Sequence, residues 1–86
     1  MIKKNNIAAI IVTYNIKKDE LIKNFNTYIE YVDKVIIVDN SDIKNDLVQL
    51  KNEKIEYINL NGNQGIGKGL NEGIKCAIKL QVIFQI

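Results

Sequence analysis

Two short apolar runs, each ending abruptly in polar residues, constrain the fold of this chain more than any other feature. Residues 7–12 and 35–38 are all apolar, and the polar segments 13–15 and 39–42 follow them directly. Unbroken runs of this length are typical of strands buried on both faces of a parallel sheet. Because parallel strands need crossover connections that cover those faces, the two runs predict an α/β domain.

The rest of the chain alternates between helical and extended patterns. Apolar residues recur at spacings of three and four in 21–32, which predicts a helix, and a shorter helix is expected across 43–50. The segment 55–60 alternates apolar and polar residues, as a strand near a sheet edge does. A further helix is expected after the glycine-rich segment, with a buried face made of Ile66, Leu70, Ile74, Ala77 and Ile78.

A fourth strand is predicted to begin at 82–84. This order of elements predicts one domain over residues 1–86, with about four mostly parallel strands between helices on both faces. In such sheets ligands bind beyond the carboxyl ends of the strands. We therefore expect the polar segments 13–15, 39–41 and 61–69 to converge on one rim.

Composition excludes several classes of function. The chain has no His, and its single Cys, Cys76, allows no intrachain disulfide, which fits a reducing cytoplasm. All twelve basic residues are Lys, scattered among acids, so the basic stripe of a nucleic-acid-binding protein is missing. The first apolar run is too short for a signal peptide, and no run approaches the ~18 apolar residues of a membrane span. We expect a cytoplasmic protein with neither a nucleic-acid partner nor a membrane span.

The three polar segments carry groups suited to a nucleotide, and each also has a simpler interpretation. Tyr14 offers a ring face to a base and Thr13 a hydroxyl, or the segment is an ordinary strand-to-helix loop. Asp39 can accept a hydrogen bond from a base imide N–H or a ribose hydroxyl, or it forms an Asx turn or a helix cap. The segment 63–73 can present backbone N–H groups to an anion, or it is a flexible loop followed by a helix whose glycines permit close packing.

Taken in order, these segments resemble the family 2 glycosyltransferases. In that family the first strand ends in V-T-Y-N, the second in V-D-N-S or V-D-D-G-S, and the motif N-x-G-x-x-x-(A/G)-x-N-x-G follows. Here the corresponding residues are 12–15, 38–41 and 63–73. The resemblance covers the chain from Ile7 onward. It implies a Rossmann-like nucleotide-diphospho-sugar transferase fold, present as a truncated three-layer α/β/α arrangement that forms the N-terminal nucleotide-binding part of the domain.

By position, the resemblance implies that Thr13 and Tyr14 pack on a pyrimidine and that Asp39 accepts its imide N–H, with Ser41 close by. Leu70 stands where many members have Arg. A leucine at this position is similar to the rhamnosyltransferase-like branch of the family and favours dTDP-rhamnose over a UDP-sugar as donor. The implied activity is sugar transfer to a cell-surface glycan. The candidate nucleotide-sugar-binding residues are Thr13, Tyr14, Asn15, Asp39, Asn40, Ser41, Asn63, Gly65 and Asn71.

The family also carries an Asp-x-Asp motif at the end of its fourth strand, which binds Mg²⁺ or Mn²⁺, and a catalytic base farther on. The sequence stops at Ile86, where that motif is due. We therefore assign no catalytic residue, metal ligand or cofactor to this chain, and expect an incomplete fragment that does not transfer sugar by itself. Its last apolar residues predict an exposed strand edge, and with it self-association or pairing with a separately encoded C-terminal half.

Two other functions fit parts of the sequence. Residues 62–69 nearly match the phosphate loop G-x-x-x-x-G-K-[ST], with Gly69 in place of the hydroxyl residue that coordinates magnesium. A P-loop-like NTP-binding module is therefore one alternative. The other is a non-catalytic remnant or interaction domain that only folds or binds a partner.

Overall fold

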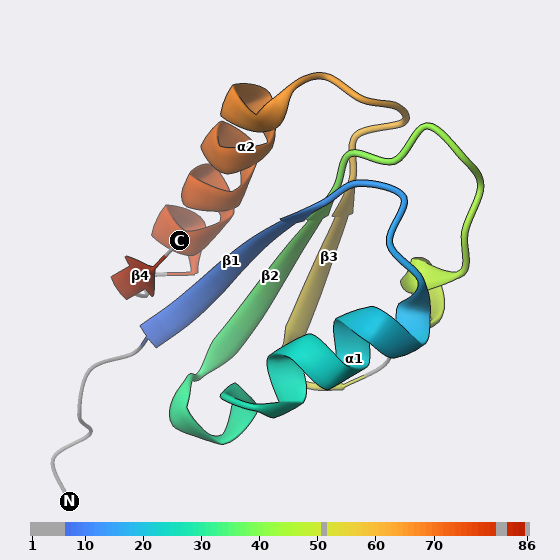
Figure 1. The fold of residues 1–86 in the computed structure, drawn as a ribbon. Coiled ribbons are helices and arrows are strands. Elements are labelled where there is room, and N and C mark those ends of the chain that lie inside the picture. Colours follow the sequence, from blue (N-terminus) through green and yellow to red (C-terminus); the bar gives the residue numbers. More distant parts are fainter. Residues whose placement is uncertain (1–6, 51, 81–82, 86) are drawn as a thin grey trace, which may run out of the picture.

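The computed structural model describes residues 7–50, 52–80 and 83–85, which form an α/β domain around one sheet (Figure 1). The strand order is β3-β2-β1-β4, and every neighbouring pair is parallel. The elements in chain order are β1 (Ile7–Thr13), α1 (Lys18–Asn26), the 3₁₀ turn η1 (Ile29–Tyr31), β2 (Lys34–Asp39), the 3₁₀ turn η2 (Leu47–Gln49), β3 (Ile55–Asn59), α2 (Ile66–Lys79) and β4 (Ile83–Gln85). The predicted fold class is confirmed.

The sheet buries a separate apolar cluster on each face, because successive side chains of a strand point to opposite sides. One cluster joins β1 and β2 to α2, and its buried members are Ala8, Ile10, Ile36, Val38, Leu60 and Ala77. The other, the α1 cluster, joins β2 to α1 and η2, and its buried members are Leu21, Phe25, Val35, Ile37 and Leu47. The two helices therefore cover opposite faces, which gives the predicted three layers (Figure 1).

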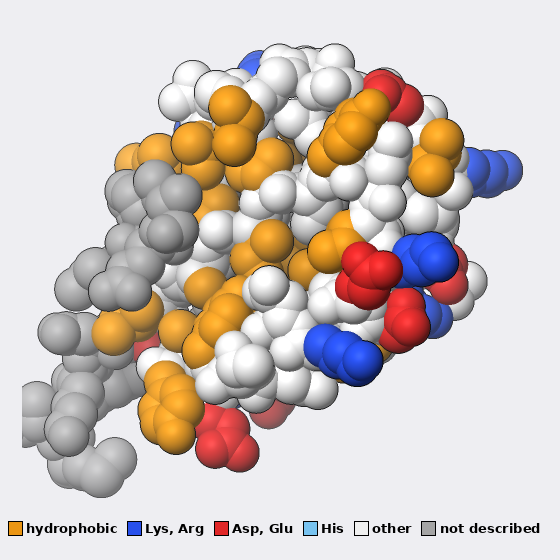
Figure 2. Space-filling view, viewed as in Figure 1, with side chains coloured by type: hydrophobic (Ala, Val, Ile, Leu, Met, Phe, Trp, Pro, Cys, Tyr) orange, Lys and Arg blue, Asp and Glu red, His pale blue; other side chains and the backbone are white. Residues whose placement is uncertain are grey.

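The edges of the described sheet are β3 and β4. The alternating sequence of β3 predicted its edge position, and β4 lies on the other side, where it pairs with Ile7, Ala8 and Ala9 of β1. The predicted first residue of the fourth strand, Val82, lies outside the described residues. On the face in Figure 2, hydrophobic side chains lie over β1 and α2, and charged side chains gather over α1. None of the described helices is long and apolar enough to cross a membrane.

The first predicted helix is shorter than its apolar spacing suggested. α1 ends at Asn26, and Tyr28 has already left the helical region, with φ of −137°. Tyr28, Ile29 and Val32 still pack against the α1 cluster, but from the 3₁₀ turn and its flanks. An i→i+3 bond of 3.0 Å from the Tyr28 N–H to the Phe25 carbonyl closes the last turn. The apolar spacing therefore continues across a helix end.

The short helix predicted across 43–50 is only partly confirmed, because its helical part is limited to the 3₁₀ turn η2 at Leu47–Gln49. Leu47 is buried as expected, whereas Ile43 is 60% exposed. The Asn45 side chain accepts the N–H of Leu47 at 3.0 Å. Local side-chain bonds of this kind compete with helical hydrogen bonding.

α2 buries only part of the predicted stripe, in which Ala77 is fully buried as expected. Ile66 and Ile78 are 70% and 65% exposed, although Leu70 and Ile74 pack partly buried against the sheet as expected. The residues that the helix buries are Gly69, Gly73 and Ala77, which recur every four positions. Small residues therefore form the contact with the sheet.

The glycines bring the backbone of α2 onto β1. A Cβ added to Gly73 would lie 2.5 Å from Ile10 Cγ2, and one added to Gly69 would lie 2.7 Å from Val12 Cγ1. Both distances are too short for real contacts. The interpretation that these glycines permit close helix packing is confirmed.

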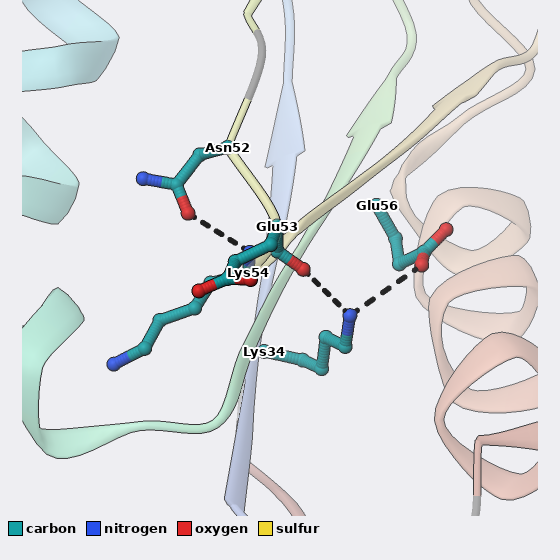
Figure 3. Close-up of polar contacts among 5 residues, drawn as sticks. All are labelled: Lys34, Asn52, Glu53, Lys54 and Glu56. Atoms are coloured by element: carbon teal, nitrogen blue, oxygen red, sulfur yellow. Dashed lines mark hydrogen bonds and ion pairs between the residues drawn. The ribbon is translucent and has the colours of Figure 1, made fainter.

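The amino ends of β2 and β3 are joined by a lysine (Figure 3). Lys34 Nζ donates to the Glu53 carbonyl at 2.7 Å and pairs with the Glu56 carboxylate at 3.8 Å. One residue before β3, the N–H of Lys54 donates to the Asn52 side chain at 2.9 Å. These contacts set where β3 begins, at the end of the sheet opposite the polar segments.

We expect Gly73→Ala to destabilise the domain by about 1–3 kcal/mol, because the added methyl overlaps the stiff β-branched side chain of Ile10. Gly67→Ala is the matched control, since a Cβ at Gly67 meets nothing within 4 Å. Alanine there should stabilise the helix by up to about 1 kcal/mol. Urea unfolding measures both changes. A Gly73→Ala protein as stable as the wild type would contradict the close contact between α2 and β1.

Candidate functional site

The polar segments that follow β1, β2 and β3 meet at the carboxyl edge of the sheet, as predicted (Figure 1). The backbone N–H of Asn40 donates to the Thr13 carbonyl at 2.8 Å, and that of Asn15 donates to Ser41 Oγ at 2.9 Å. The N–H of Gln64 donates to Asn40 Oδ1 at 2.8 Å. Hydrogen bonds therefore tie the three segments into one rim.

Asp39 lies within this rim and is only 2% exposed. Its Oδ1 accepts hydrogen bonds from the N–H of Ser41 at 3.0 Å and from the hydroxyl of Thr13 at 3.4 Å. Its Oδ2 accepts from the hydroxyl of Tyr57 at 2.6 Å and from the side-chain amide of Asn45 at 3.0 Å. The bond from Ser41 is the Asx turn that the sequence left as one possibility.

Strand register explains why these donors reach one carboxylate. Thr13 pairs with Asp39 across β1 and β2, and Asp39 pairs with Asn59 across β2 and β3. Tyr57 comes two residues before Asn59, so the side chains of both point to the same face of the sheet. Tyr57 thus lies diagonally from Asp39 on the neighbouring strand.

The donors keep Asp39 ionised although it is buried. Burial by itself raises the pKa of a carboxyl group, but hydrogen bonds from Ser41, Tyr57 and Asn45 outweigh it and hold the Asp39 pKa below its ordinary value. Burial and the bond to Asp39 raise the pKa of the Tyr57 hydroxyl far above its usual range, so that this group remains a donor. The site therefore presents a fixed negative charge at neutral pH.

Asn40 holds the glycine-rich segment in place. It is 3% exposed, and its Nδ2 donates to the Gly65 carbonyl at 2.9 Å while its Oδ1 accepts from Gln64. Gly65 has φ of +86°, a region that side-chain-bearing residues rarely adopt, and its N–H donates to Asn63 Oδ1 at 2.9 Å. Asn40, Asn63 and Gly65 are therefore brought together, with Asn40 as the buried partner.

Asp42 connects the first segment to the third. Its carboxylate accepts from the Tyr14 hydroxyl at 2.8 Å and from the Asn63 N–H at 3.1 Å, while its own N–H donates to Asn15 Oδ1 at 3.0 Å. Tyr14 remains 56% exposed, and the hydrogen bond to Asp42 raises the pKa of its hydroxyl. The Tyr14 ring is thus oriented by one polar contact and still accessible for stacking.

A cavity of about 310 Å³ opens beside Asp39, between the loops that follow β2 and β3. This volume is near the lower end of the range for ligand pockets, roughly 300–1,000 Å³. It suits part of a nucleotide better than a whole nucleotide sugar. The cavity is lined by Asp39, Ser41, Asp42, Ile43, Lys44, Asn45, Val48, Tyr57, Asn59, Asn61 and Gly62.

Some of the predicted site residues line the cavity and others support it, whereas Asn71 does neither. Asp39 and Ser41 line it. Tyr14 does not, but its hydroxyl donates a hydrogen bond to Asp42, which does. Thr13 is 3% exposed, and its hydroxyl is directed to Asp39 rather than outward. Asn71 lies exposed on α2, and within the described residues no hydrogen bond joins it to the other candidates.

Sequence reasoning missed Asn45 and Tyr57, which both touch Asp39. The alternation of β3 placed Tyr57 on one face of a strand but could not say which strand lies beside it. Asn45 carried no signal at all, because its segment was interpreted as helical. Only the register of β2 with β3 brings these side chains to the carboxylate.

The family resemblance implies a divalent cation, and the side chains described here do not supply a site for one. No group of three His, Cys, Asp or Glu side chains comes together within residues 7–50, 52–80 and 83–85. We therefore derive no step of a reaction through a metal ion.

The geometry of the glycine-rich segment disfavours a phosphate loop. That motif needs Ser or Thr at position 69, where a Cβ would overlap Val12. Lys68, which would have to reach the phosphates, is paired with Glu72 at 3.6 Å on the surface of α2. The glycine at position 69 instead allows α2 to pack closely against β1.

A parallel sheet between two helix layers, with polar loops tied together at its carboxyl edge, defines a Rossmann-like α/β domain of the kind that binds nucleotides. The sequence pattern of Glycosyl transferase family 2 matches residues 8–85. The chain belongs to that family.

One relative is the low-salt glycan biosynthesis hexosyltransferase Agl10 of Haloferax volcanii. It is 34% identical over 74 residues, which make up 86% of this chain and 24% of that protein. The chain thus spans about a quarter of the length of this relative. No solved structure matches the chain significantly.

We expect Asn40→Ala to destabilise the domain by about 1–3 kcal/mol, because it leaves the Gln64 N–H without its buried partner and leaves the Gly65 carbonyl with only the Gly69 N–H as donor. Asn52→Ala is the control, since Asn52 is an exposed asparagine whose side chain accepts a single backbone N–H at the far end of the sheet. Amide hydrogen exchange should show faster exchange at Gln64 only in the Asn40 variant. Unchanged exchange there would mean that Asn40 does not hold the segment.

Proposed function

We propose that this chain binds the pyrimidine nucleotide of a nucleotide-diphospho-sugar, as the nucleotide-binding part of a glycosyltransferase. The observation that carries the proposal is the buried, ionised carboxylate of Asp39 beside a cavity of about 310 Å³ at the carboxyl edge of the sheet. Membership of Glycosyl transferase family 2 supports a nucleotide-sugar donor.

The chemistry of the carboxylate selects the base. An ionised carboxylate only accepts hydrogen bonds. Uracil and thymine offer an imide N–H at the ring position where cytosine has a bare acceptor, and adenine has no such group. The exposed ring of Tyr14 lies at the same rim and can stack on the base, with its hydroxyl held by Asp42.

The activity proposed for the whole protein is transfer of a sugar to a cell-surface glycan in the cytoplasm. The relative is a hexosyltransferase of glycan biosynthesis, which supports sugar transfer but leaves the donor open. Leu70 favours dTDP-rhamnose over a UDP-sugar, on the resemblance to the rhamnosyltransferase-like branch. Self-association, or pairing with a separately encoded second half through the β4 edge, is part of the same proposal.

We expect UDP and dTDP to bind weakly and ATP and CDP not to bind detectably, because only uracil and thymine carry the imide donor. Isothermal titration calorimetry with the four nucleotides is the measurement. A preference for ATP over UDP and dTDP would favour the NTP-binding alternative. Equal binding of UDP and CDP would show that Asp39 does not read the imide.

We expect Asp39→Asn and Asp39→Ala to abolish UDP binding, since loss of a hydrogen bond to a buried charged group costs about 1.5–3 kcal/mol. Lys68→Ala should change the affinity little, because Lys68 pairs with Glu72 on the surface of α2. Thermal unfolding of each variant separates lost binding from lost folding, and the isosteric Asn variant is the milder test. A strong loss of binding at Lys68 with none at Asp39 would reverse the assignment.

A further inference from the structure

Every acceptor position of Asp39 is already occupied in the free protein. An ionised carboxylate has about four lone-pair sites, and Asp39 accepts from Ser41, Thr13, Tyr57 and Asn45. The bond from Thr13, at 3.4 Å, is the longest of the four and comes from a residue that does not line the cavity. An imide N–H that enters through the cavity therefore takes the place of one of the three shorter bonds.

Three of the donors are poorly placed to leave. The Ser41 donor is a backbone N–H inside the Asx turn. Thr13 is 3% exposed and does not line the cavity, so a ligand entering there does not reach its position. Tyr57 belongs to β3, its ring packs against the α1 cluster, and its bond to Asp39 is the shortest of the four at 2.6 Å.

Of the four donors, Asn45 alone is a loop side chain that also lines the cavity. It lies on the loop between β2 and η2, lines the cavity, and donates to the same oxygen as Tyr57 at 3.0 Å. It also borders a second cavity of about 520 Å³, formed by residues 15–19 and 43–46. The side chain thus borders open space in two cavities. It belongs to no strand, and its other hydrogen bond is the one that its Oδ1 accepts from the Leu47 N–H.

A donor that can be exchanged for the ligand avoids leaving an acceptor position of the buried Asp39 carboxylate unsatisfied in the empty site. A buried carboxylate with an open acceptor position is costly, because water no longer satisfies it. Replacing one N–H···O bond by another is nearly neutral, so a side chain that covers the position until the ligand arrives removes that cost.

From this geometry we infer that Asn45 covers the acceptor position on Asp39 Oδ2 that the imide N–H of uracil or thymine takes in the complex. The inference rests on the proposed function and adds a residue that competes with the base. Asn45 is then a determinant of affinity whose removal strengthens binding, in contrast to a residue that contacts the nucleotide.

The test is Asn45→Ser. Serine keeps a side-chain oxygen that can accept the N–H of Leu47, as Asn45 does at 3.0 Å, but it is too short to reach Asp39. We expect UDP to bind about fivefold more tightly to this variant, the effect of removing one net competing hydrogen bond. CDP binding should stay undetectable. Tyr57→Phe removes the other donor to the same oxygen and should not tighten UDP binding.

Each outcome of the calorimetry decides something. UDP affinity that is unchanged or weaker in Asn45→Ser overturns the inference while leaving the proposed function in place. Tightening in both Asn45→Ser and Tyr57→Phe also overturns it, because the two donors would then be equivalent. Absence of UDP and dTDP binding to the wild type overturns the proposed function and the inference together.

A second measurement uses the wild type, so that it stands even if the serine variant folds poorly. We expect the side-chain amide protons of Asn45 to exchange slowly in the free protein and faster when UDP is bound, as followed by NMR. Protection that persists at saturating UDP would mean that Asn45 stays on Asp39, and would overturn the inference.

Discussion

Asp39 is 2% exposed with its carboxylate ionised, and the end of the sheet is organised around that charge. A buried carboxylate is tolerated only when hydrogen-bond donors replace the lost water. Thr13 supplies one from β1, Ser41 and Asn45 supply two from the loop after β2, and Tyr57 supplies one from β3. A shift of either neighbouring strand would remove a donor, so the register of three strands is coupled to one charge.

Neighbouring residues at the end of β2 have different roles because they point to opposite faces of the sheet. Asp39 lies on the α1 side with Tyr57, whereas Asn40 lies on the α2 side, where its Nδ2 is 3.6 Å from the position of a Cβ on Gly69. Asp39 thus offers its charge to the cavity, and Asn40 fixes the glycine-rich segment. Of these two adjacent polar residues, Asp39 is therefore the candidate ligand contact and Asn40 the structural residue.

The glycines of α2 show how one sequence pattern fits two mechanisms. Glycines before a helix are compatible with binding phosphate, and glycines within a helix are compatible with close packing. Here Gly69 and Gly73 face Val12 and Ile10 of β1, which leaves no space for the hydroxyl residue of a phosphate loop. The helix contact, rather than the motif, decides between the two.

The sequence by itself determined the α/β class, the parallel sheet and the convergence of the polar segments, because the runs 7–12 and 35–38 are stable only when both faces of their strands are covered. It also singled out Asp39. It failed at the end of α1 and over most of 43–50, where local hydrogen bonds from Tyr28 and to Asn45 override apolar spacing. Only the tertiary structure decided which donors reach Asp39, because a change of one residue in strand register turns every side chain to the opposite face.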